Sequence, residues 1–424
     1  MKTNIIETLK ARDFIDNTTS DDLEVICQKK RGVYIGFDPT ADSLHLGNLV
    51  GIIALGWFQK FGHKPVALAG GATGFIGDPT GKSADRPYLD KKTLKHNLMG
   101  IQKNLQQILT FDDKNPVELL NNYEWHQKMS YLDFLRDVAQ HCRISTLLAR
   151  ETVKERLQTG EGMSFKEFSY PLLQAYDFLY LHQNHDVSLQ LGGSDQWTNI
   201  TSGIDLTRKV CQKEVYGLTF PLLTRSDGKK FGKSESGAIW LSKEKLSPYD
   251  FYQYLYRISD QDVIKLLKML TYLSIEEIKE IESSMLLENY QVNTAQKILA
   301  KVVTEIVHGK DELKTALEVT ENMRPGSETE LNFEILKRMS SEIPSVSLSL
   351  DQIVNEKLVD LLIVANIMTS KGEVRRLIQN GGVYLNNERI DDDKFIIEKN
   401  HLIKDECILL AIGKKKKTII FVKK

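Results

Sequence analysis

The chain has 424 residues, of which 41% are apolar and 27% are charged, and its formal net charge is −1. This length allows two to four domains, and the ordinary composition excludes disordered and collagen-like chains. No apolar run reaches the length of a membrane span, and the first residues lack the apolar core of a signal peptide. The four cysteines lie far apart without a Cys-x-x-Cys pair, so neither a zinc site nor a disulfide framework is indicated. We therefore expect a cytoplasmic protein that makes no membrane contact.

A strand that runs into a helix is predicted near the start of the chain. Residues 33–37 form a short apolar run that ends at the turn-forming pair Asp38-Pro39, and apolar residues then recur at helical spacing. The start of a helix offers unpaired N–H groups and a positive dipole end, which suit a phosphate. Gly47 leaves room for a base or a ribose against the backbone. Taken alone, His45-Leu-Gly-Asn48 is more often only a capped helix start.

A second informative stretch is the polar run at residues 224–236, which contains three lysines. Lys230 and Lys233 are three residues apart on a loop that also contains Gly232. Two ammonium groups with this spacing can close over a polyphosphate and open again. An isolated lysine-rich loop, by contrast, is more often only a solvated surface.

The order of these two stretches resembles the signature pair of the class I aminoacyl-tRNA synthetases. The segments between them are similar to those of the bacterial-type tyrosyl-tRNA synthetases, over essentially the whole chain; they are residues 34–40, 70–79, 170–177 and 192–197. The resemblance implies an enzyme that activates L-tyrosine with ATP to tyrosyl-adenylate and pyrophosphate. The enzyme would then transfer the tyrosyl group to the terminal adenosine of tyrosine tRNA. Mg²⁺ would accompany ATP, mainly on phosphate oxygens, with no other metal site.

A glycine-rich loop at residues 70–83 follows a second apolar strand at 65–69. It is not a Walker phosphate loop, because that pattern needs a glycine at position 76, which is Ile76. Glycine-rich loops at the carboxyl ends of strands are nevertheless where open α/β sheets bind ligands. Alternating strand and helix signals across residues 33–220 predict an α/β fold with a doubly wound parallel sheet, a Rossmann-like catalytic domain at residues 1–223.

Tyr170, Gln174 and Asp177 have the spacing of one face of a helix. On spacing alone, a solvated polar stripe is as well supported as a binding pocket. The apolar neighbours Leu172, Leu173, Phe178 and Leu179 leave little of this helix free for water, which favours a pocket lining. The resemblance places a helical insertion that forms a homodimer interface at about residues 115–185. An apolar helix face is predicted there at Leu132, Leu135 and Val138.

A further short buried strand is predicted at residues 187–191, followed by the turn that contains Asp195. A carboxylate at the carboxyl end of a strand is well placed to bind ribose hydroxyls. The alternative is that Asp195 caps the next helix, since Asp is a favoured N-cap residue. The two roles are compatible.

The catalytic lysine loop and its connection are predicted at residues 224–246. After them, the alternation of strand and helix signals ends. A helical pattern at 247–321 is the domain that faces the anticodon arm in the resembled family, and the composition of 322–349 predicts a linker. Residues 350–424 form a small α+β module, in which 372–386 resembles an RNA-binding module shared with a small-subunit ribosomal protein. The lysine run that ends at Lys417 is more often a solvated tail, but this resemblance favours contact with the RNA backbone.

The resemblance also assigns roles to individual residues. Those that would hold the leaving pyrophosphate are Thr40, His45, Lys230 and Lys233, with Lys82 and Arg86 as further contributors. Those that would bind tyrosine are Tyr34, Asp78, Tyr170, Gln174, Asp177 and Gln196, the phenol being bound by Tyr34 and Asp177. Those that would bind ATP and the adenylate are Asp38, Gly47, Asn48, Gly192, Asp195, Gln196 and Lys233. The attacking tyrosine carboxylate is already an anion, so catalysis depends on positioning and on cations near the developing charge.

Three positions depart from the family pattern. Asn48 stands where the signature has its second histidine, which puts in doubt any protonation role at that position. Ile35 replaces a small or thiol residue, so a minor ribose contact is in doubt, and Phe231-Gly232 replaces the more general Met-Ser of the lysine loop.

Two other functions are compatible with parts of this pattern. A tryptophanyl enzyme shares fold and mechanism, but Tyr34 with Asp177 and the C-terminal module favour tyrosine. An RNA-binding protein that keeps a synthetase scaffold without catalysis is disfavoured by the presence of His45, Lys230 and Lys233.

Overall fold

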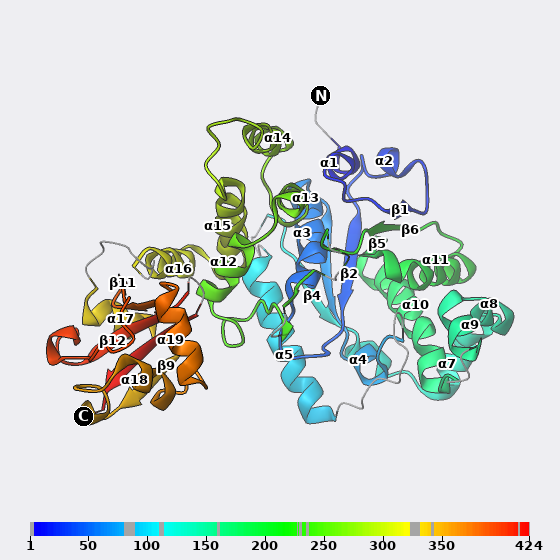
Figure 1. Ribbon diagram of the computed structural model, residues 1–424. Coiled ribbons are helices and arrows are strands. Elements are labelled where there is room, and N and C mark those ends of the chain that lie inside the picture. Colours follow the sequence, from blue (N-terminus) through cyan, green and yellow to red (C-terminus); the bar gives the residue numbers. More distant parts are fainter. Residues whose placement is uncertain are drawn as a thin grey trace. The chain divides into compact units, whose positions relative to one another are not determined.

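The computed structural model describes residues 4–79, 90–109, 114–158, 162–226, 228, 231–234, 237–322, 331–340, 343–413 and 416–423 (Figure 1). The chain packs into two compact units. The first comprises residues 1–246 and 254–308, and the second comprises 247–253 and 309–424. Among the described residues, no helix combines the length and the apolar character needed to cross a membrane.

The first unit is built on a six-stranded sheet with the strand order β1-β6-β5-β2-β3-β4. The strands are β1 Asn17–Thr18, β2 Gly32–Phe37, β3 Lys64–Ala69, β4 Glu118–Asn121, β5 Val187–Gly193 and β6 Tyr216–Phe220. All neighbouring strands are parallel except the edge strand β1, which runs antiparallel to β6. From β2 the chain moves outward to β3 and β4 and then returns to β5 on the other side of β2. Ligands of open α/β sheets bind at such a reversal, at the carboxyl ends of the strands.

Helices cover both faces of this sheet. Ile35 on β2 points to α3 Leu46–Lys60, because a Cβ built at Gly51 would lie 2.5 Å from the Ile35 Cδ1 atom. Its neighbour Tyr34 points to the other face, where its ring lies 5.3 Å from that of Phe178 on α10 Phe165–His185. Successive side chains of a strand alternate between faces, so α3 and α10 lie on opposite sides. This confirms the predicted doubly wound α/β fold.

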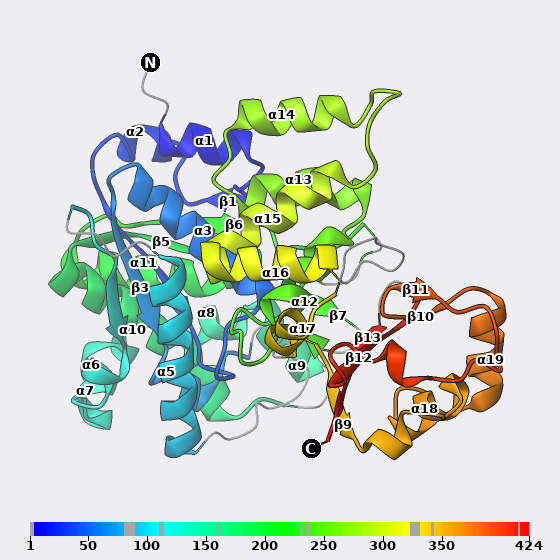
Figure 2. The same cartoon turned by 90° about the vertical axis from the view of Figure 1, so that its left-hand side faces the viewer.

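The remaining helices of the first unit complete its layers. They are α1 Ile5–Ala11, α2 Leu23–Ile26, α4 Thr73–Ile76, α5 Lys91–Ile108, α6 Tyr123–His126, α7 Tyr131–Asp137, α8 Ile144–Leu148, α9 Glu151–Gln158, α11 Trp197–Cys211, α13 Asp260–Leu270, α14 Ile275–Ser284 and α15 Thr294–His308. Figure 2 shows α13 between α14 and α15, and α13 also packs against α3. The helix α12 Pro248–Tyr256 spans the division between the two units.

The predicted apolar face at residues 132–138 is wrong in one position. Leu132 and Leu135 are 74% and 38% exposed, whereas Val138 is fully buried and packs with Leu172 and Leu179. The physical reason is that α7 ends at Asp137, so the helical period stops before Val138 and the chain turns inward.

The second unit contains a five-stranded sheet with the order β11-β10-β12-β13-β9. Its strands are β9 Ser345–Leu348, β10 Val383–Leu385, β11 Glu388–Arg389, β12 Cys407–Ile412 and β13 Lys416–Val422, and its helices are α16 Lys310–Asn322, α17 Phe333–Met339, α18 Leu358–Val364 and α19 Lys371–Gln379. Residues of α18, α19, β10 and β12 share one apolar core. Asn386 and Asn387 have φ values of 50° and 70° and form the two-residue turn between β10 and β11.

The boundaries in the second half of the chain differ from the predicted ones. The predicted linker at 322–349 contains the helix α17 and the strand β9, which pairs in parallel with β13. Its Ser-rich composition hid the alternation of Val346 and Leu348, whose side chains lie on the core of the small module. The predicted helical domain at 247–321 is helical, but its helices are divided between the two units.

Candidate active site

The two signature stretches of the sequence lie against each other. A Cβ built at Gly232 would lie 3.2 Å from the Gly47 nitrogen, so the backbone of the lysine loop rests on the first turn of α3. The φ of Gly232 is +84°, a value that favours glycine. Backbone hydrogen bonds fix this contact, since the Leu46 N–H donates to Ile239 O at 2.8 Å and the Ile239 N–H donates to Gly232 O at 2.8 Å.

His45 is the N-cap of α3. Its Nδ1 accepts from the Gly47 N–H at 3.1 Å, and the Asn48 Oδ1 accepts from the His45 N–H at 3.0 Å. This reciprocal arrangement explains why His and Asn stand three residues apart. Because Nδ1 is an acceptor, a neutral His45 ring carries its proton on Nε2.

A buried carboxylate lies on the opposite side of the sheet, at Asp177 on α10. Its side chain is 2% exposed and receives three N–H donors. The Trp125 Nε1 and the His126 Nε2 each lie 2.8 Å from its Oδ1, and the Asn122 Nδ2 lies 2.9 Å from its Oδ2. Three donors are what a buried anion requires, so the surroundings are built for the ionised form of Asp177.

Tyr34 lies beside this carboxylate, and its hydroxyl makes no hydrogen bond to the described residues. The side chain is 1% exposed, and its hydroxyl has no hydrogen-bond partner among the described residues. Burial raises the pKa of Tyr34 well above its usual value, and the negative charge of Asp177 raises it further. A buried hydroxyl without a partner costs free energy, which a ligand with a matching polar group would recover.

A second carboxylate, Asp38, follows β2 directly. Its oxygens accept from the Thr73 hydroxyl at 2.7 Å and from the Tyr170 hydroxyl at 2.9 Å. Burial raises the pKa of Asp38 to about 6; the two hydrogen bonds lower the value, and the charges of Asp78 and Asp177 raise it. Three acidic groups therefore gather around one space, an arrangement that favours a cation.

Gln196 connects the strand β5 with this acidic group. Its Nε2 donates to Asp78 Oδ2 at 2.8 Å, and its Oε1 accepts from Gln174 Nε2 at 3.4 Å and from Asn199 Nδ2 at 3.2 Å. Tyr170, Gln174 and Asp177 all lie on α10, as their spacing predicts. Tyr170 and Asp177 are buried and Gln174 is half-buried, so these side chains do not form a solvated stripe.

The turn after β5 is shaped by a glycine. A Cβ built at Gly192 would lie 2.9 Å from the Gln196 Cβ, so a larger residue would push Gln196 out of place. Asp195 lies in a short 3-10 turn at Ser194–Gln196 and is exposed. It is not the cap of α11, whose N-cap is Gln196 without a side-chain hydrogen bond. The alternative helix-cap reading of Asp195 is therefore wrong.

Of the remaining residues predicted to hold the pyrophosphate, two are described by the structure and three are not. Thr40 is exposed, and its N–H donates to Asp38 O at 2.9 Å. Lys233 lies in the short strand β7 Lys233–Ser234, which pairs with β8 Gly237–Ala238. Lys82, Arg86 and Lys230 lie outside the described residues.

Several residues of the site were not predicted from the sequence. Asn122, Trp125 and His126 directly follow β4, and their position at the carboxyl end of a parallel strand is a signal that could have identified them. Gln190 interrupts an apolar strand and is 2% exposed, with its Oε1 unpaired among the described residues. It pairs in register with Tyr34, so both side chains face the same side of the sheet.

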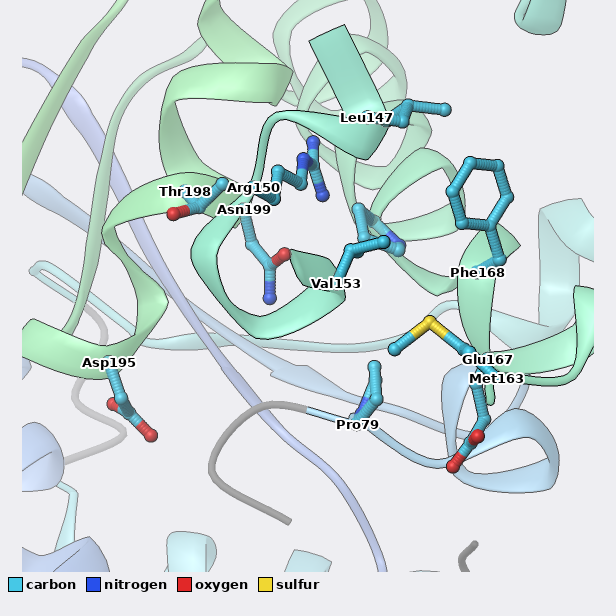
Figure 3. Close-up of a pocket in the computed structure, with 11 residues that line it drawn as sticks. Pro79, Leu147, Arg150, Val153, Met163, Glu167, Phe168, Asp195, Thr198 and Asn199 are labelled. Atoms are coloured by element: carbon cyan, nitrogen blue, oxygen red, sulfur yellow. The ribbon is translucent and has the colours of Figure 1, made fainter. Parts of the chain in front are cut away.

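A cavity adjoins this site (Figure 3). Pro79 and Asp195 line it together with Arg150, Glu167 and Asn199. Burial lowers the pKa of the Arg150 guanidinium to about 10, and its Nη2 donates to the Ser202 hydroxyl. Glu167 is fully buried, and one of its oxygens lies 3.4 Å from Arg156 Nη2. Arg150 and Glu167 are therefore charged, buried groups next to the residues that follow β3 and β5.

Two family models match the chain, one over its larger N-terminal part and one over its C-terminal part. The model of the class I tRNA synthetases for Trp and Tyr matches residues 28–323. The model of the SYY-like C-terminal domain of tyrosine–tRNA ligases matches residues 334–420. The chain therefore belongs to the class I aminoacyl-tRNA synthetases.

Relatives define the branch of this class. The tyrosine–tRNA ligase of Protochlamydia amoebophila is 53% identical, over 99% of each chain. A C-terminally truncated mitochondrial tyrosyl-tRNA synthetase of Aspergillus nidulans has a TM-score of 0.68 and 32% identity, covering 74% of this chain and 92% of that one. A tryptophanyl-tRNA synthetase of Encephalitozoon cuniculi, with 13% identity, a TM-score of 0.54 and 73% and 86% coverage, shares the fold alone. The activity of the chain is thus tyrosine–tRNA ligation, with ATP as the activating substrate.

Proposed function

We propose that the tyrosine substrate binds where β2 and β5 end, with its phenol between Tyr34 and Asp177. The observation that supports this most directly is the Tyr34 hydroxyl, which is buried and has no partner among the described residues. A substrate phenol would accept from Tyr34 and donate to Asp177, so both polar groups would be satisfied. Phenylalanine would leave them unpaired; tyrosyl enzymes are themselves the standard example of such discrimination without editing.

The ammonium group of tyrosine would lie near the acidic residues at the other end of the pocket. Asp78, Tyr170 and Gln174 are the proposed ligands, and Gln196 holds both Asp78 and Gln174 through its amide. The negative charges of Asp38 and Asp78 would attract the ammonium group. The Tyr170 hydroxyl connects this subsite with Asp38, a proposed ligand of the adenylate.

The nucleotide would occupy the space between α3 and the turn after β5. Proposed contacts are made by Asp38, Gly47, Asn48, Gly192, Asp195 and Gln196. The absence of a side chain at Gly47 leaves the first turn of α3 accessible to a flat group. Asn48 keeps a polar side chain there, but its Oδ1 already caps His45.

The first chemical step would be attack of the tyrosine carboxylate on the α-phosphorus of ATP. The new C–O–P link forms as the bond to pyrophosphate breaks, and negative charge grows on the phosphate oxygens. Thr40, His45, Lys230 and Lys233 would stabilise this charge, with Lys82 and Arg86 as further cations. Mg²⁺ would enter with ATP on phosphate oxygens, since the carboxylates Asp38 and Asp78 are engaged by protein donors.

The proposed partners are tyrosine tRNA and a second copy of this chain. The module at 350–424 would contact the RNA backbone through exposed basic residues such as Arg375 and Arg376. Large apolar side chains are exposed on the insertion, which supports a homodimer interface there; they are Tyr131, Leu132, Ile144, Leu148, Leu157 and Phe165. The four cysteines are all free thiols, which supports a reducing compartment such as the cytoplasm.

ATP–pyrophosphate exchange tests this assignment. Exchange is expected with tyrosine, and not with tryptophan or phenylalanine at the same concentration. His45→Ala is expected to lower the adenylation rate constant while leaving tyrosine affinity nearly unchanged, because the charge that His45 meets exists only in the transition state. An unchanged rate constant would remove His45 from the mechanism.

A further inference from the structure

The carboxylate proposed to read the phenol is itself held by a histidine. His126 and Asp177 are 9% and 2% exposed, and the His126 Nε2 lies 2.8 Å from the Asp177 Oδ1. His126 is the last residue of the short helix α6, which follows β4. Its ring meets the edge of the Tyr176 ring, with the centroids 5.5 Å apart. The imidazole thus contacts two neighbouring residues of α10.

The charge state of His126 does not change its role as a donor. An ionised carboxylate only accepts hydrogen bonds, so the proton between the two groups belongs to the His126 Nε2. A neutral ring must therefore be the Nε2–H tautomer, and a protonated ring keeps the same donor. The titratable groups recorded next to the ring are Asp177 and Tyr176, both on α10.

The donors around Asp177 fill its acceptor sites unequally. An ionised carboxylate has about four lone-pair sites, two on each oxygen. Trp125 and His126 both donate to Oδ1, and Asn122 donates to Oδ2. Among the described residues, one acceptor site is therefore left, and it is on Oδ2.

We propose that His126 is a specificity-determining positioning residue, which fills the second acceptor site of the Asp177 Oδ1 and thereby directs the substrate phenol to Oδ2. This inference rests on the proposed phenol-binding role of Asp177. Without the His126 donor, Oδ1 has an open acceptor site, and the carboxylate is held by Trp125 and Asn122 alone among the described residues, so the phenol is no longer directed to Oδ2. Tyrosine then gains less over phenylalanine from the pocket.

Exchange kinetics of full-length variants with tyrosine and with phenylalanine test this. His126→Phe keeps a ring against Tyr176 but has no donor, and it is expected to lower the selectivity for tyrosine about tenfold, through tyrosine KM and not kcat. His126→Gln, which restores an N–H donor, is expected to keep the selectivity of the unmodified protein.

A matched control is His185, whose Nδ1 lies 2.7 Å from the Glu118 Oε1 in a pair outside the pocket. His185→Phe is expected to leave the selectivity unchanged. The proposal is overturned if His126→Phe retains the selectivity of the unmodified protein, or if His126→Gln loses as much as His126→Phe. If His126→Phe does not fold, His126→Leu removes the same donor with a smaller side chain and is judged by the same outcomes. If instead Asp177→Asn leaves the selectivity intact, it is the proposed phenol site that fails.

Discussion

The two ends of the proposed amino-acid pocket hold their carboxylates in different ways. Asp177 receives three N–H donors, whereas Asp38 receives two hydroxyl donors and lies near two further acidic groups. The first arrangement stabilises an anion before any substrate arrives. In the second, burial raises the pKa of Asp38 to about 6, and the charges of Asp78 and Asp177 contribute to the rise. In the proposed pocket, one end is therefore preformed for a neutral phenol, while the other depends on the cation that it would bind.

The two ends are nevertheless joined by direct hydrogen bonds. The Asn122 Nδ2 lies 2.9 Å from the Asp177 Oδ2 and 3.0 Å from the Thr73 hydroxyl oxygen. The Thr73 hydroxyl in turn donates to Asp38. A substitution at one end can therefore shift the side chains at the other end. Variants are distinguished by whether they change the selectivity for tyrosine over phenylalanine or the affinity for tyrosine.

The largest effect is expected at the phenol end, from Asp177→Asn. The amide is a weaker acceptor, and its NH₂ group faces N–H donors, so selectivity for tyrosine over phenylalanine is expected to fall about 100-fold. Exchange kinetics with both amino acids measure this ratio. Asp137→Asn, a change at an exposed acid on α7, serves as the control. Undiminished selectivity would show that the phenol is read elsewhere.

A smaller effect of a different kind is expected at the acidic end, from Tyr170→Phe. The ring remains, but the hydroxyl that donates to Asp38 is lost. Tyrosine KM is expected to rise about tenfold, while the tyrosine-to-phenylalanine ratio stays unchanged, because both substrates carry the same ammonium group. Tyr216, whose hydroxyl donates to Glu214 Oε2 at 3.1 Å away from the site, offers a matched Tyr→Phe control. A loss of selectivity instead would mean that the two ends do not act separately.

The smallest effect is expected from Thr73→Val in the connection between the ends. The substitution removes one donor that holds down the pKa of Asp38. Tyrosine affinity is expected to fall about threefold, and the midpoint of its pH profile is expected to move upward. Titrations of tyrosine binding between pH 5 and pH 8 measure both changes. A midpoint that moves downward would contradict the assigned hydrogen bond.

The sequence predicts the strands and the helix that carry the site better than the side chains that surround Asp177. Short apolar strands and the helical spacing of Tyr170, Gln174 and Asp177 are local patterns, and the structure confirms the strands and the shared helix. The partners of Asp177 lie about 50 positions away in the chain, and only the parallel pairing of β3 with β4 brings them to the same sheet edge. Val138 was misplaced for the opposite reason, because a local period was extended past the end of α7.

The most direct test of the difference between the two ends compares tyrosine with 3-(4-hydroxyphenyl)propanoate, which lacks the ammonium group. Calorimetric titrations of both ligands would be made at pH 7.5 and at pH 5.5. A pKa near 6 at Asp38 means that the carboxylate is mostly ionised at the higher pH and mostly protonated at the lower one. Tyrosine is therefore expected to bind about fourfold more weakly at pH 5.5, while the analogue binds no more weakly. Equal weakening of both ligands would contradict the account, since the loss would then not depend on the ammonium group.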